Sequence, residues 1–95
     1  MTTEIASAKF HVYGTTSWGH PVDKQVTLHL GQSGAFGYGN GLAVRVEYDG
    51  GGIDQLYDVR YDRRLRRDGS NYTEWVKGFA NDIFDSALTV EMIEE

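Results

Sequence analysis

The sequence predicts an α+β fold, a two-layer sandwich in which one amphipathic helix packs on one face of a mostly antiparallel sheet. Three observations support this prediction. Four stretches in the first part of the chain alternate apolar and polar residues with a period of two, as half-buried strands do. A later stretch repeats its apolar residues every three or four positions, as an amphipathic helix does. A short final alternation follows, so the predicted order is β-β-β-β-α-β.

The four predicted strands share one design, with apolar residues at every second position on one face. They are KFHVYG (9–14), QVTLHL (25–30), LAVRVEY (42–48) and IDQLYDVRYD (53–62). Clean alternation favours an antiparallel sheet with one face in water. The run Asp49–Gly52 predicts a tight hairpin turn, because its residues tolerate positive φ. Leu56 interrupts the polar face of the fourth strand, which indicates a bulge or a contact there.

The predicted helix covers 72–84, where the apolar positions follow helical spacing. These positions are Tyr72, Trp75, Val76, Phe79, Ala80, Ile83 and Phe84, and we expect Trp75, Phe79 and Phe84 in the core. Asn71 is expected to cap the first amides, with Glu74 reaching back as in a capping box. Gly78 lies on the outer side of the helix and weakens it by up to ~1 kcal/mol relative to alanine. The last strand is predicted from Leu88, Val90 and Met92.

Composition indicates one small acidic domain spanning 1–95. The 95 residues are 40% hydrophobic, and the net charge at pH 7 is −5. The absence of cysteine excludes disulfides, a thiolate nucleophile and a cysteine-ligated zinc. No apolar run has the length of a membrane helix and the start lacks the pattern of a secretion signal, so we expect no membrane association and a cytoplasmic location. One helix cannot cover five strands, so homodimer formation through an edge strand stays open.

An arginine-rich segment is the first candidate binding site. It contains Arg60, Arg63, Arg64, Arg66 and Arg67. If the first four strands form a meander, the glycine-rich loop 31–41, with Phe36 and Tyr38, reaches the same end of the sheet. These aromatic and guanidinium groups would then form one surface.

That surface suits two kinds of partner. An acidic patch on another protein would bind the guanidinium groups through bidentate pairs, with the aromatic rings as anchors. Single-stranded nucleic acid would use the same groups for phosphate contacts and base stacking. The acidic remainder of the chain favours the protein partner. The simplest alternative is that Asp58, Asp62 and Asp68 neutralise the arginines and the loop is only solvated.

An alternative working surface uses the acidic side chains of the sheet. Glu47, Asp54, Asp58 and Asp62 fall on its predicted polar face, where residues two apart on a strand lie roughly 6.6 Å apart. Such a row would imitate a phosphate backbone, as small acidic inhibitors of phage or mobile-element type do. A merely solvated face is the simpler interpretation.

The sequence contains no pattern typical of catalysis or cofactor binding. The glycine-rich loop matches neither a dinucleotide-binding nor a P-loop motif. His11 and His29 are expected as neighbours on the polar face, but no third metal ligand lies near them in sequence. Ser17 and His20 lack the surroundings of a nucleophile elbow. We expect Trp18 to cover the core as a lid, and the alternative is that it serves as an exposed anchor.

The sequence therefore predicts a non-catalytic cytosolic domain without metal or cofactor. Its first predicted role is protein interaction, inhibitory or accessory in kind. Nucleic-acid binding through the arginine-rich and glycine/aromatic loops is the alternative, and a small enzyme is the third interpretation.

Overall fold

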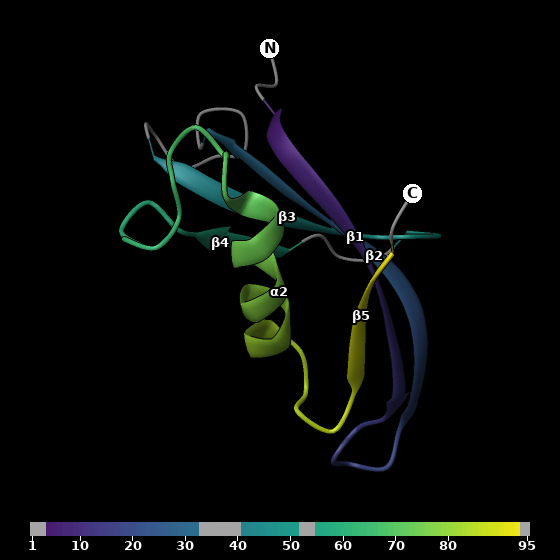
Figure 1. The fold of residues 1–95 in the computed structure, drawn as a ribbon. Coiled ribbons are helices and arrows are strands. Elements are labelled where there is room, and N and C mark those ends of the chain that lie inside the picture. The colour runs from purple at the N-terminus through teal and green to yellow at the C-terminus, as the bar shows by residue number, and fades with distance from the viewer. Residues whose placement is uncertain (1–3, 33–40, 52–54, 94–95) are drawn as a thin grey trace.

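The computed structural model describes residues 4–32, 41–51 and 55–93, which form one antiparallel sheet with a helix across one face (Figure 1). In chain order the elements are β1 (Glu4–Thr15), β2 (Pro21–Gln32), β3 (Leu42–Tyr48), β4 (Gln55–Asp58), α2 (Tyr72–Ile83) and β5 (Thr89–Ile93). The strands lie in the order β4-β3-β2-β1-β5. The predicted α+β sandwich and the meander of its first four strands are confirmed, and the last strand lies beside β1.

The core lies between α2 and the apolar face of the sheet. Cross-strand partners place Phe10 beside Val26 and Leu28 beside Val46 on that face. The helix contributes Tyr72, Val76 and Ala80, each at most 1% exposed. Burying a side chain of valine or phenylalanine size stabilises a fold by about 1.5–3 kcal/mol, so these rows supply most of the packing energy.

Tyr72 is the polar contact between the helix and the centre of the sheet. Its hydroxyl donates to the backbone carbonyl of Leu28 at 2.7 Å, within the core. Burial raises the pKa of Tyr72 above its ordinary value, so the hydroxyl keeps the proton that it donates. This bond fixes the start of α2 over β2.

The first hairpin is longer than the sequence predicts. β1 and β2 pair as far as Thr15 and Pro21, whereas β3 reaches only Val26 of β2. The hairpin therefore projects beyond β3, and Trp18 at its turn is 86% exposed. The prediction of Trp18 as a lid is wrong, because the turn lies beyond the core that it was expected to cover.

The tip of this hairpin is tied to the segment that follows α2. Ser17 donates to a carboxylate oxygen of Asp85 from its amide at 3.1 Å and from its hydroxyl at 2.8 Å. The amide of Ala87, together with these two donors, lowers the pKa of Asp85. Trp18 is thus presented on a tethered turn.

The fourth strand is shorter than predicted. β4 ends at Asp58, and the amide of Val59 then bonds to the carbonyl of Leu42 at 3.0 Å as the chain leaves the sheet. Leu56 lies opposite Arg45 in regular register, so the bulge, one of the two alternatives that the sequence indicated, does not form. The glycine turn behaves as predicted in its described part, where Gly50 and Gly51 have positive φ.

Candidate functional site

The segment Val59–Asn71, here called the arginine loop, joins β4 to α2 and is ordered by its own backbone contacts. Three of its contacts share one geometry, in which an aspartate accepts a bond from the amide two residues later. They are Asp58 with Arg60 at 3.1 Å, Asp62 with Arg64 at 2.9 Å and Asp68 with Ser70 at 2.9 Å. The aspartates among the arginines therefore shape the loop as well as carrying charge.

Asn71 holds the loop closed instead of capping the helix. Its side-chain oxygen accepts from the amide of Arg66 at 2.8 Å, and its side-chain nitrogen donates to the carbonyl of Arg64 at 2.6 Å. No side-chain cap bond forms at the start of α2, so the predicted capping box is wrong. The physical reason is that one amide satisfies two backbone groups around Leu65, which is 5% exposed and belongs to the core.

Gly69 completes the loop where it passes β1. Its φ is +75°, and a Cβ built there would lie 2.6 Å from Cγ2 of Ile5. Glycine is therefore required at this position for two reasons, the positive φ of its backbone and the close approach of β1. The loop is a packed part of the domain.

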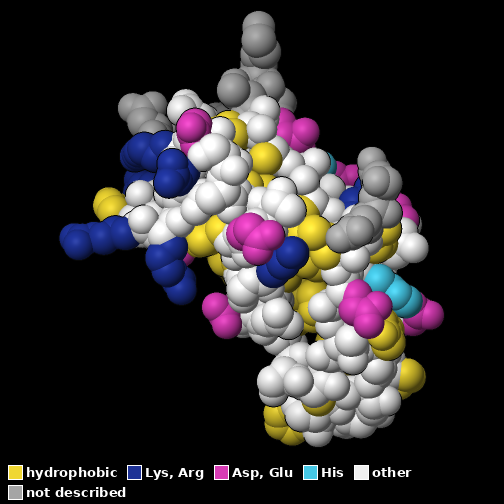
Figure 2. Space-filling view, viewed as in Figure 1, with side chains coloured by type: hydrophobic (Ala, Val, Ile, Leu, Met, Phe, Trp, Pro, Cys, Tyr) yellow, Lys and Arg dark blue, Asp and Glu magenta, His cyan; other side chains and the backbone are white. Residues whose placement is uncertain are grey.

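The arginine side chains fall into two groups. Arg60 pairs with Asp58 at 2.9 Å, and Arg64 pairs with Asp62 at 3.5 Å. Arg63, Arg66 and Arg67 are exposed and form no ion pair with any of the residues that the structure describes. Figure 2 shows dark blue side chains gathered over this end of the molecule. The aspartates of this segment therefore neutralise only part of the positive charge of its arginines.

Asp68, the third aspartate of the proposed neutralising set, acts on the backbone. The amide and hydroxyl of Ser70 are the main cause of the lowered pKa of Asp68, and Arg66 adds a smaller electrostatic contribution. Asp68 therefore stays ionised while it accepts the hydrogen bond from the Ser70 amide that stabilises the turn.

The structure describes the end of the glycine-rich loop but neither of its two aromatic residues. Phe36 and Tyr38 lie outside the described residues. The end of their loop does meet the arginine loop, because a Cβ on Gly41 would lie 2.5 Å from Cδ of Arg60. The shared end of the sheet that the meander predicts is thus confirmed for Gly41 and Arg60, and the placement of the two aromatic residues stays a prediction.

Tyr61 is an exposed aromatic residue that sequence reasoning missed. It is 81% exposed, and the guanidinium carbon of Arg60 lies 5.0 Å from its ring centroid. The alternation pattern assigned Tyr61 to the buried face of a strand continuing to 62. Because β4 ends at Asp58, the ring lies instead in the arginine loop.

The predicted row of carboxylates is not formed by the residues described. Asp54 lies outside them. Glu47 contacts His29 and Arg45, and Asp58 pairs with Arg60. Asp62 has left the sheet and accepts a bond from the indole nitrogen of Trp75 in α2 at 3.1 Å. The acidic face is therefore interrupted by cations and by the early end of β4.

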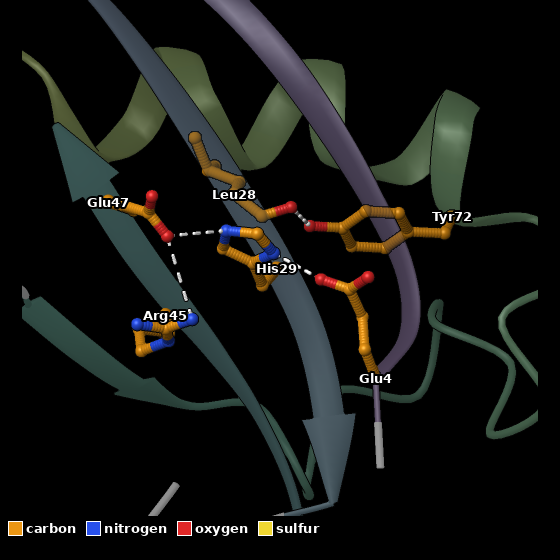
Figure 3. Close-up of polar contacts among 6 residues, drawn as sticks. All are labelled: Glu4, Leu28, His29, Arg45, Glu47 and Tyr72. Atoms are coloured by element: carbon orange, nitrogen blue, oxygen red, sulfur yellow. Dashed lines mark hydrogen bonds and ion pairs between the residues drawn. The ribbon is translucent and has the colours of Figure 1, made fainter. Parts of the chain in front are cut away.

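His29 lies at the centre of a polar cluster on the open face of the sheet (Figure 3). Its Nδ1 contacts Glu4, and its Nε2 lies 3.1 Å from Glu47. His11 bonds to Asp23 at 2.6 Å and lies opposite Gln25, so the two histidines are not cross-strand neighbours as expected. Within 4–32, 41–51 and 55–93, no group of three or more His, Asp or Glu side chains is arranged to hold a metal ion.

A hollow of about 370 Å³ adjoins the arginine loop on the outer side of α2. It is lined by Asp62, Arg64, Asn71, Glu74, Trp75, Gly78, Phe79 and Asp82. The rings of Trp75 and Phe79 stack with centroids 4.8 Å apart. Trp75, Phe79 and Phe84 are half-buried, so their assignment to the core was correct only in part.

One side of this hollow is a stripe of α2 whose spacing is visible in the sequence. Glu74, Gly78 and Asp82 recur every four residues and so lie on one outer stripe of the helix. A Cβ on Gly78 would meet nothing within 4 Å, so no neighbour in the described chain requires glycine there. Gly78 leaves the floor of the hollow bare.

Asp62 provides a test of the link between the loop and the helix. Burial raises the pKa of Asp62, but bonds from the Arg64 amide and the Trp75 indole outweigh it, so the pKa is lowered overall. A depressed pKa stabilises the fold above the unfolded-state value near 3.9, and this contribution is lost as pH falls through the folded-state value. Asp62→Asn should therefore cost about 1 kcal/mol at neutral pH and much less in acid.

Urea unfolding at about pH 7 and about pH 2.5 measures this difference. Asp49→Asn, in the exposed β3–β4 turn, is the matched control and should change stability by less than about 0.5 kcal/mol. An equal cost for Asp62→Asn at both pH values would show that its carboxylate charge has no role.

Comparison with protein-family models, with curated proteins and with solved structures finds no match. No helix in the described part of the chain is long and apolar enough to cross a membrane. Function is therefore inferred from the geometry of the site.

Proposed function

We propose that this chain is a small non-catalytic binding domain that uses the arginine loop to contact an acidic patch on another protein, in an inhibitory or accessory role. The observation that supports this most is the state of Arg63, Arg66 and Arg67, which carry charge without an ion pair among the described residues. They project from a loop whose backbone is already fixed by Asn71 and Leu65. A preformed loop loses less entropy on binding than a flexible one.

A protein partner accounts for these features better than a polyanion does. Guanidinium groups pair with carboxylates in bidentate geometry, and an exposed tyrosine beside arginine is typical of interface hot spots. The net charge of −5 opposes long-range attraction of nucleic acid. Glu74 and Asp82, beside the same loop, would repel a phosphate backbone that continues along α2.

Nucleic-acid binding is the second candidate, and Tyr61 is the observation that favours it. Its exposed ring, with Arg60 5.0 Å from the centroid, could stack on an unpaired base while the free arginines contact phosphates. Such binding would weaken steeply with salt.

The test is affinity capture from nuclease-treated lysate with the wild type and with Arg66→Gln/Arg67→Gln. The affinity for the captured protein should fall about 30-fold in this variant, at about 1 kcal/mol for each arginine. Lys9→Gln/Lys24→Gln removes the same charge from exposed positions outside the loop and should leave capture unchanged.

Two results would contradict the proposal. Undiminished capture by Arg66→Gln/Arg67→Gln would remove the loop as the contact surface. Saturable, steeply salt-dependent binding of single-stranded oligonucleotide, lost in that variant, would make nucleic acid the partner.

A further inference from the structure

We propose that the hollow beside α2 is a second binding site, which takes the guanidinium group of an arginine side chain on the partner protein. The inference rests on the proposed function for the nature of the partner. It concerns a different set of groups, however, because the arginine loop offers cations and the hollow offers carboxylates and aromatic rings. The two sites adjoin, since Asp62 and Arg64 of the loop form one wall of the hollow.

The carboxylates that line the hollow outnumber its cationic side chains. Arg64 is balanced by Asp62, with 3.5 Å between their atoms. Glu74 has a weak partner in Lys77, 3.4 Å away, and its side chain is 81% exposed. Asp82 forms no ion pair or hydrogen bond with the described residues. The site thus presents two incompletely balanced carboxylates beside the stacked rings of Trp75 and Phe79.

Gly78 gives an independent reason to place a ligand here. Glycine in an exposed helix interior weakens the helix, and nothing in the described chain occupies the space that a methyl group would fill. A bare backbone between Glu74 and Asp82 lets a flat group approach the helix closely. An occupant lying close to the helix backbone would account for glycine at this position.

A guanidinium group fits these walls better than other groups do. It is planar and weakly hydrated, stacks on aromatic rings and pairs with carboxylates through two parallel bonds. A lysine ammonium is more strongly hydrated and lacks the flat shape. An apolar side chain would bury the carboxylates without partners, and an anion would be repelled.

The experiment uses the intrinsic fluorescence of Trp75. The chain has two tryptophans, so Trp18→Phe removes the exposed one and leaves Trp75 as the reporter. The probe is acetyl-Gly-Arg-Gly-amide, and its control is the same peptide with citrulline, which has nearly the same shape without the charge. A saturable change in emission is expected with the arginine peptide, and binding of the citrulline peptide should be about tenfold weaker.

Variants in the Trp18→Phe background locate the site. Glu74→Gln/Asp82→Asn should weaken peptide binding about tenfold, whereas Asp49→Asn/Glu91→Gln, with the same charge change at other exposed positions, should not. Gly78→Ala should keep or raise the melting temperature yet weaken binding about fivefold, which separates blockage of the hollow from unfolding. Arg66→Gln/Arg67→Gln should still bind the peptide, so failure of the arginine loop and failure of the hollow are distinguishable.

Three results would overturn the inference. One is no saturable response to the arginine peptide, and another is an equal response to the citrulline peptide. The third concerns a second copy of this chain, whose Arg63, Arg66 and Arg67 carry the same chemical group. Sedimentation showing self-association that Glu74→Gln/Asp82→Asn abolishes would make that copy the occupant in place of a different protein.

Discussion

Replacing Gly69 with alanine is expected to destabilise the domain by about 2–4 kcal/mol, because two penalties act at one position. The first is the φ of +75°, which costs a residue with a Cβ roughly 1–2 kcal/mol. The second is the contact at 2.6 Å between the new Cβ and Cγ2 of Ile5, a β-branched side chain with little rotamer freedom. Relief of this contact must move β1 or the loop, and the loop carries the arginines.

Gly50→Ala separates the two penalties. Gly50 has a φ of +85°, but a Cβ there would meet nothing within 4 Å, so only the backbone term remains. Denaturant unfolding should show that Gly69→Ala costs at least about 1 kcal/mol more than Gly50→Ala. Equal losses would mean that Ile5 does not lie against Gly69 in solution.

Replacing Leu65 with alanine is expected to cost about 2–4 kcal/mol, although the residue is surrounded in sequence by arginines. Leu65 is 5% exposed and joins the main hydrophobic core, so truncation removes buried methyl groups and leaves a cavity. Because Asn71 closes the arginine loop around Leu65, the backbone amides of the loop should also lose protection from hydrogen exchange.

Leu56→Ala is the matched control for this prediction. Leu56 is half-buried on the open face of β4, outside the hydrophobic core, and its truncation should cost less than about 1.5 kcal/mol. Unfolding midpoints and exchange rates of the loop amides measure both variants. If Leu65→Ala cost no more than Leu56→Ala, the arginine loop would not be anchored through its leucine.

The parts of the fold that follow from periodic burial could be predicted from sequence. Val26, Leu28 and Leu30 alternate with polar residues because one face of β2 is buried in the core, and the helical spacing of Tyr72, Val76 and Ala80 reflects one buried stripe. Burial of one side of a strand or helix produces a periodic pattern of apolar residues in the sequence. The α+β sandwich and the meander were predicted from that pattern.

The parts that depend on single polar contacts could not be predicted in this way. The early end of β4 leaves no periodic signal, because Val59 stays buried and Tyr61 retains the alternation while lying outside the strand. Asn71 fits a helix cap equally well in sequence. The hydrogen bonds of its side chain to the backbone of Arg64 and Arg66 depend on the three-dimensional path of the loop, which brings these groups close to Asn71.

The candidate site was partly predictable for the same reason. Clustering of arginines is visible in the sequence, and the shared end of the sheet follows from the meander. The hollow was not predicted, because the aromatic spacing of Trp75 and Phe79 is also that of a core face. Their half-burial arises from the position of α2 on the sheet, which periodicity does not describe.

The backbone contacts of the arginine loop also make it a scaffold for variation. Its conformation depends on Asp58, Asp62, Asn71, Leu65 and Gly69, whereas the side chains of 63, 66 and 67 contribute no ion pair to the described structure. We therefore expect substitutions of these three side chains to leave the fold intact. A library randomised at 63, 66 and 67 should yield mostly folded members, and natural selection could redirect the domain to new targets by the same three codons.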